Sequence, residues 1–152
     1  AGTILNTASV AGLAPMFGQF GPYTTSKFGV VGLSLSLRAA AAEYGVHVSV
    51  LCPGVIDTAI WDAPWPDDLP IPASQVGAPP LREAMEKAGT KFYPADRLAE
   101  DTLRGLEKNK AILAIPGDAR RLWLLARLSP DLVIRQMIKA TAANRRAVPA
   151  HR

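Results

Sequence analysis

Tyr23 and Lys27 are the two residues of this chain best suited to acid–base chemistry, because they place a phenol and an amine four positions apart. On a helix, residues at this spacing lie on one face, one turn from each other. A free phenol titrates near pH ~10 and carries protons poorly at neutral pH. A unit positive charge ~4 Å away in a partly screened site favours the phenolate by about 4 kcal/mol. The spacing therefore predicts a general acid or base.

Two further segments are expected to converge on this pair. Ser9 follows an apolar stretch, residues 3–8, that is typical of a buried strand, and Pro53-Gly54 ends a second predicted strand over residues 46–52. Ligands of open parallel sheets bind beyond the carboxyl ends of the strands. We therefore expect Ser9, the Tyr23–Lys27 pair and Pro53 to line one site.

The order of the predicted elements indicates an α/β fold. A helix is predicted over 22–44, opened by Pro22 and stopped by Gly45. The remaining elements are short helices over 81–89 and 94–109, a strand over 110–115 and closing helices over 117–128 and 130–145. Alternation of strands and helices predicts a partial, doubly wound parallel sheet made of three strands with crossover helices.

Composition limits the class of protein. The chain has 152 residues and is 49% hydrophobic, which is enough for one domain with one core. Cys52 is its single cysteine; this excludes an internal disulfide and fits a reducing compartment, so we expect a cytoplasmic protein. The net charge is +4, and much of the excess positive charge lies from Arg120 onward. No aromatic residues are interleaved with these cations after Trp123. We favour a solvated basic helix face over a nucleic-acid surface.

The helix over 22–44 is expected to contact a partner. Between Phe28 and Ala42 its only charged residue is Arg38, so apolar residues occur all around it and it should be buried on more than one side. Its small residues, Gly29 and Gly32 among them, would let another backbone approach closely. We predict a homodimer or homotetramer built on this helix; burial inside one large domain is the alternative. For the basic segment over 120–128, packing on the sheet is favoured over contact with a membrane surface.

Three motifs, in this order, resemble the short-chain dehydrogenase/reductase family: residues 6–12 (NTASVAG), 23–27 (YTTSK) and 52–58 (CPGVIDT). The resemblance is specific over roughly residues 1–60 and continues to about Ile115 by element order alone. It implies the C-terminal half of a Rossmann-like domain and a nicotinamide-dependent oxidoreductase that acts on an alcohol or carbonyl. In that family Tyr23 would be the general acid or base, Lys27 would assist it and bind the nicotinamide ribose, and Ser9 would orient the substrate oxygen.

The resemblance also implies a cofactor segment and a substrate loop. The cofactor-binding residues would be Tyr23, Lys27, Pro53, Gly54, Val55, Ile56 and Thr58. Gly54 would let the backbone approach a flat ring. The proline-rich region over 61–94 would fold over a small, apolar alcohol or ketone substrate, with Trp61 and Trp65 as its wall or as simple loop packing. The resemblance does not extend to residues 116–152, which are expected from their own sequence pattern to form closing helices and a basic tail.

Departures from the family pattern set the remaining expectations. The glycine-rich pyrophosphate turn, the residue that separates NAD from NADP and a relay asparagine have no counterpart here, so the cofactor is NAD or NADP. We expect a C-terminal catalytic portion that cannot turn over substrate alone. A non-catalytic binding or regulatory member of the same fold is the alternative.

A serine hydrolase fails because Thr7 and Ala11 occupy the glycine positions of Gly-x-Ser-x-Gly. No metal site is expected, Asp57 should fix a turn, and Cys52 should be a core residue.

Overall fold

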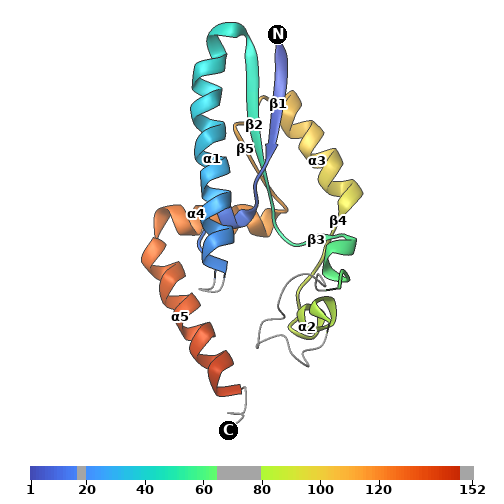
Figure 1. Ribbon diagram of the computed structural model, residues 1–152, viewed down its shortest axis with the longest axis vertical. Helices are drawn as coiled ribbons and strands as arrows, with labels where there is room; N and C mark the ends of the chain where they lie inside the picture. Colours follow the sequence, from blue (N-terminus) through green and yellow to red (C-terminus); the bar gives the residue numbers. More distant parts are fainter. Residues whose placement is uncertain (17–19, 65–79, 148–152) are drawn as a thin grey trace.

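A three-stranded parallel sheet forms the centre of the molecule (Figure 1). The computed structural model describes residues 1–16, 20–64 and 80–147. The sheet has the order β1 (Gly2–Thr7), β2 (Val46–Pro53) and β5 (Ile112–Ile115). β1 pairs with β2 from Gly2↔Val46 to Thr7↔Leu51, and β2 pairs with β5 from Val50↔Ile112 to Pro53↔Ile115. The predicted α/β fold with a parallel sheet is confirmed.

The long helix α1 (Gly21–Ala41) connects the carboxyl end of β1 to the beginning of β2. Pro22 lies in its first turn, where a missing N–H costs nothing. A single 3₁₀ turn follows (Ala42–Tyr44), and Gly45 ends it in the left-handed region at φ 65°. Both predicted end signals therefore act as expected, and the chain reverses into β2.

Four more α-helices belong to the described fold. These are α2 (Leu81–Lys87), α3 (Ala95–Glu107), α4 (Gly117–Leu128) and α5 (Pro130–Ala147). α1 and α3 lie on opposite sides of the sheet, while α4 and α5 continue from β5 (Figure 1). All of these helices were expected within a few residues of their ends. No helix in the described ranges combines the length and the apolar character that crossing a bilayer requires.

Two very short strands were not predicted. β3 (Ile56–Asp57) and β4 (Tyr93–Pro94) pair in parallel and form a separate two-stranded sheet. β3 lies just before the proline-rich region and β4 at its end, so their pairing brings the two ends of this region together. Residues 65–79 of that region, including Trp65, lie outside the described residues.

The core lies between α1 and the sheet. Val31 of α1 packs with Ala8, Val50 and Cys52, and the last two side chains are fully buried. Only Val31, Ser34 and Ala41 of α1 are buried, while Leu33 on another face is 65% exposed. The expectation that α1 is buried on more than one side is therefore not met within the described chain, because only its sheet-facing side is covered.

Arg38 fastens α1 to both neighbouring segments. Its guanidinium donates to the carbonyl oxygen of Val48 on β2 and to the backbone and side-chain oxygens of Asn109, each of the latter at 2.8 Å. Asn109 has a φ of 47° and turns the chain from α3 toward β5. A single charged side chain on an otherwise apolar helix face thus holds the helix, the buried strand and this turn together.

Candidate active site

The structure brings the side chains of Tyr23 and Lys27 together. The Lys27 Nζ lies 5.4 Å from the centroid of the Tyr23 ring, within the range of a cation–π contact. Both residues lie in the first two turns of α1, and the i, i+4 spacing makes their side chains neighbours. Tyr23 is 45% exposed, so its phenol is accessible to a ligand. The expected juxtaposition of amine and phenol is therefore present.

Ser9 follows β1 directly, in an extended conformation with φ −172° and ψ 163°. Its Oγ accepts a hydrogen bond of 3.2 Å from the N–H of Ala11 and so caps the 3₁₀ turn Val10–Gly12. A serine hydroxyl has one donor and two acceptor lone pairs. The cap uses one lone pair and leaves the O–H available to donate to a substrate oxygen.

Gly12 sets the distance between the Ser9 turn and α1. A Cβ at this position would lie 2.5 Å from the carbonyl oxygen of Lys27 and 2.8 Å from its carbonyl carbon. The turn therefore rests directly on the helix backbone at the residue whose amine contacts Tyr23. Ala11, beside it, is completely buried. The sequence analysis missed this contact; its only sequence signal is the small pair Ala11-Gly12 after the serine.

The segment after β2 is held against the beginning of α4. Gly54 N–H donates to the Ile115 carbonyl at 2.7 Å. A Cβ on Gly54 would lie 3.2 Å from Pro116 Cδ and 3.3 Å from Ala119 Cβ. Packing against these two residues leaves little room for a side chain at this position, and the expected approach of a flat ring to Gly54 stays a prediction.

Farther along the same segment, Ile56 is buried in β3 and Thr58 is exposed. Thr58 precedes the 3₁₀ turn Ala59–Trp61, and its hydroxyl makes no capping bond there. The Thr58 hydroxyl thus caps no turn of the described chain, and its expected role at the cofactor stays a prediction.

Arg82 is a clamp that sequence reasoning did not find. From α2 it reaches the Oδ1 of Asp57 at 2.9 Å, the Oδ1 of Asp62 at 2.7 Å and the carbonyl oxygen of Thr58 at 3.1 Å. Its guanidinium also lies 4.9 Å from the centroid of the Phe92 ring. Hydrogen bonding to Arg82 holds the pKa of the Asp62 carboxyl below its usual value. Asp57, which was expected to fix a turn, instead lies in β3, and its carboxylate is held by a side chain of a distant helix.

Trp61 packs within its own loop. Its indole N–H donates to the Ile56 carbonyl at 2.6 Å, and its ring meets Phe92 edge-on, with centroids 5.8 Å apart. Of the two readings given for this tryptophan, these contacts favour loop packing over a substrate wall.

Cys52 is the core residue that the sequence predicted. Its side chain is fully buried, and burial raises the pKa of the thiol to about 11. A hydrogen bond from the backbone of Ser9 opposes this shift but is the weaker influence. At neutral pH Cys52 is therefore a protonated, apolar-like side chain directly beneath the Ser9 turn.

Comparison with known proteins bears directly on this arrangement. Residues 1–68, which contain Ser9, Tyr23, Lys27 and the segment after β2, match the family described as short chain dehydrogenase. Residues 1–68 belong to the short-chain dehydrogenase/reductase family. Similarity to curated dehydrogenases extends farther along the chain, as the following relatives show.

Two curated relatives align with nearly the whole chain. A probable oxidoreductase, EphD, of Mycobacterium tuberculosis is 30% identical over 147 residues, which are 93% of this chain and 23% of EphD. Dehydrogenase/reductase SDR family member 9 of Homo sapiens is 31% identical over 168 residues, covering 97% of this chain and 51% of the relative. The chain thus spans about half, or less, of the length of these relatives.

Solved short-chain dehydrogenases share the fold. An enzyme from Burkholderia phymatum in complex with NAD superposes with a TM-score of 0.66 at 27% identity, covering 86% of this chain and 48% of that one. An enzyme from Sphingobium yanoikuyae in complex with NADPH gives a TM-score of 0.57 at 23% identity, covering 91% of this chain and 44% of that one. The partial Rossmann-like architecture predicted from the sequence is confirmed.

Proposed function

We propose that this protein transfers hydride between a nicotinamide cofactor and an alcohol or carbonyl carbon, with Tyr23 moving the proton. The observation that carries the proposal is the contact of Lys27 Nζ with the Tyr23 ring, at 5.4 Å from its centroid. The Ser9 turn supports it, since Gly12 seats that turn on the Lys27 backbone. Three groups able to act on one oxygen are thus carried by two elements in direct contact.

Each side chain has a separate task in the reduction direction. Ser9 donates its free O–H to the carbonyl oxygen and stabilises the negative charge that develops there. Tyr23 gives its proton to that oxygen as the carbon accepts hydride, which produces an alcohol and a phenolate. Lys27 stabilises the phenolate by its positive charge. In oxidation the alcohol proton returns to Tyr23.

The residues present fit NAD or NADP at the carboxyl ends of β1 and β2. The cofactor would supply the hydride. Lys27 carries a donor-rich ammonium for the ribose hydroxyls, and Tyr23 lies beside it. The remaining candidates form the segment after β2: Pro53, Gly54, Val55, Ile56 and Thr58. Because structural relatives hold NAD in one case and NADPH in another, both cofactors belong in the test.

We further propose that α1 pairs with a second copy of the protein in a homodimer or homotetramer. Leu33 is 65% exposed and Phe28 44% exposed, although both belong to an apolar helix. A Cβ added to Gly29 or Gly32 would meet nothing within 4 Å. Nothing in the described chain therefore requires these glycines, whereas a helix of a second copy would. Light scattering of the complete protein should give a dimer or tetramer, and Leu33→Asp should shift it toward monomer; a monomeric parent protein would contradict this.

The test of the enzymatic proposal is carbonyl reduction by the complete protein with NADH and with NADPH. Tyr23→Phe should lower kcat about a hundredfold, the usual scale for loss of a general acid, while cofactor affinity changes little. Tyr44→Phe is the matched control, since this tyrosine is 72% exposed at the far end of the helix region. Cofactor binding without any turnover of carbonyls or alcohols would instead support the non-catalytic alternative, and an unchanged kcat in Tyr23→Phe would refute the role of Tyr23.

A further inference from the structure

Asn6 is the first residue of the motif that contains Ser9, and the proposed reaction gives it no task. It lies in β1, three residues before Ser9, with its side chain partly buried. Its amide nitrogen Nδ2 donates to the Oγ of Ser34 on α1 at 3.0 Å. Asn6 therefore joins the strand that leads to Ser9 to the helix that carries the Tyr23–Lys27 pair.

The direction of this hydrogen bond is set within the helix. The Ser34 hydroxyl donates its hydrogen to the Val30 carbonyl oxygen at 2.6 Å, so toward Asn6 it can only accept. Ser34 is 2% exposed. A serine that bonds back to the preceding turn slightly destabilises a helix, and alanine is the better helix former. The bond with Asn6 gives a reason for a hydroxyl at this buried position.

Two more contacts join the same two segments in a regular order. Ala8 follows Asn6 on the same face of the strand and packs against Val31 of α1. Gly12 then meets the Lys27 carbonyl oxygen, one turn nearer the N-terminus of the helix. The chain from Asn6 to Gly12 thus runs along two turns of α1, about 10 Å of its length.

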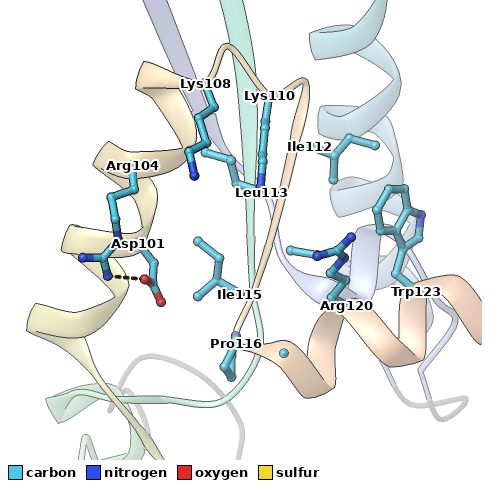
Figure 2. A pocket seen from close by; sticks show the side chains of 13 residues that line it. Asp101, Arg104, Lys108, Lys110, Ile112, Leu113, Ile115, Pro116, Arg120 and Trp123 are labelled. Atoms are coloured by element: carbon cyan, nitrogen blue, oxygen red, sulfur yellow. Dashed lines mark hydrogen bonds and ion pairs between the residues drawn. The ribbon is translucent and has the colours of Figure 1, made fainter.

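Ser49 of β2 offers a matched control. It is also a buried serine, 1% exposed, and its hydroxyl donates to the Lys110 carbonyl oxygen at 2.7 Å. Lys110 borders a cavity of about 400 Å³ between α3, β5 and α4 (Figure 2), which neither Ser9 nor the Tyr23–Lys27 pair lines. Removing the Ser49 hydroxyl therefore costs a buried hydrogen bond while the contacts between α1 and the Ser9 segment stay in place.

We propose that Asn6 is a positioning residue, which fixes α1 so that Tyr23 stands at the right distance from Ser9. Apolar packing at Val31 has no preferred direction, and the steric contact at Gly12 only limits how closely the two segments approach. A hydrogen bond has a preferred length and angle, so it also fixes the rotation and axial position of the helix. A displacement of roughly 1 Å between catalytic groups can cost about a hundredfold in rate. The inference rests on the proposed function, in which Ser9 and Tyr23 act on one oxygen.

The test is steady-state carbonyl reduction by the complete protein with NADH and with NADPH. Asn6→Ala and Ser34→Ala should each lower kcat about five- to tenfold, while the cofactor Kd changes less than about twofold. The double variant should be no slower than the slower single variant, because both substitutions remove the same bond. Ser34→Thr keeps the hydroxyl and should restore kcat. Ser49→Ala should lower the unfolding temperature as Ser34→Ala does, but without a loss of kcat.

Amide hydrogen exchange tests the placement of the Ser9 turn without turnover. The Gly12 N–H donates to the Ser9 carbonyl oxygen at 2.9 Å, and it should exchange about fivefold faster in Ser34→Ala than in Ser49→Ala. Equal exchange in the two variants would show that the bond from Asn6 does not steady this turn and would overturn the inference.

The outcomes separate this inference from the proposed function. A parent protein that reduces no carbonyl would overturn the proposed function and, with it, any catalytic purpose for Asn6. In an active parent protein, an unchanged kcat in Ser34→Ala, or an equal loss of kcat in Ser49→Ala, would overturn the positioning role alone. A double variant slower by the product of the two single losses would also overturn it, because Asn6 and Ser34 would then act separately.

Discussion

Replacing Gly12 with alanine tests whether the turn after Ser9 is held in place by the backbone of α1. The new Cβ would lie 2.5 Å from the Lys27 carbonyl oxygen, 2.8 Å from the carbonyl carbon and 3.0 Å from Val31 Cγ2. Carbon atoms in contact prefer separations of about 3.5–4.0 Å. Two of the three obstructing atoms are backbone, so no side-chain rotation relieves the overlap, and the turn or the helix must move.

The size of the effect follows from that overlap. Inserting a methyl group into a filled site costs about 1–3 kcal/mol of folding stability. A displacement of roughly 1 Å between catalytic groups can cost about a hundredfold in rate. We therefore expect Gly12→Ala to lower the unfolding temperature by several degrees and kcat by about tenfold to a hundredfold, with a smaller change in cofactor affinity.

The assays are thermal unfolding and steady-state carbonyl reduction by the complete protein. Gly2→Ala serves as the matched control, because a Cβ there meets nothing within 4 Å and both measurements should stay near the parent values. If Gly12→Ala also left stability and kcat unchanged, the turn would not be positioned by its contact with Lys27. A stability loss without any loss of kcat would make Gly12 a packing residue only.

Two further predictions concern Cys52 and Arg82. Burial raises the pKa of Cys52 from its ordinary value of 9.0 to about 11, so its contribution to stability is complete below the unfolded thiol pKa and is lost as pH rises toward 11. Over that pH window, urea unfolding should show the free energy of unfolding declining by about 2–3 kcal/mol. Cys52→Ala should remove this part of the decline. The same dependence on pH in the variant would assign the decline to other ionisable groups. Arg82→Ala removes the hydrogen bonds to Asp57, Asp62 and the Thr58 carbonyl. It should weaken cofactor binding about tenfold, measured by titration calorimetry, with kcat little changed. An unchanged affinity would show that Arg82 does not organise the cofactor segment.

The elements that could be predicted from the sequence carry strong local signals. Pro22 and Gly45 mark the ends of the α1 region, and the β-branched run of β2 marks a buried strand. β3 and β4 escaped prediction because a two-residue strand has no measurable period, and their pairing depends on residues far apart in sequence. Local patterns thus predicted the layers of the fold but not the pairing across the proline-rich region.

The candidate site was predictable where its geometry is local to one helix. The Tyr23–Lys27 contact follows from i, i+4 spacing alone, whereas the Gly12 contact depends on how two elements meet. Arg82 lies on a helix twenty residues or more from the groups it holds, so no spacing rule reveals it. Gly54 shows a second reason that the sequence did not reveal: its packing against Pro116 depends on how β2 and α4 meet, while its role at a cofactor stays a prediction.

A double-mutant cycle on Tyr23 and Lys27 tests the central claim most directly. Lys27→Met, Tyr23→Phe and the double variant are compared by kcat at saturating cofactor and substrate, so that a binding role of Lys27 does not enter. If Lys27 acts on the chemistry through Tyr23, the double variant should be no slower than Tyr23→Phe, about a hundredfold below the parent. A double variant slower by the product of the two single losses would contradict the account, because the amine and the phenol would then act independently.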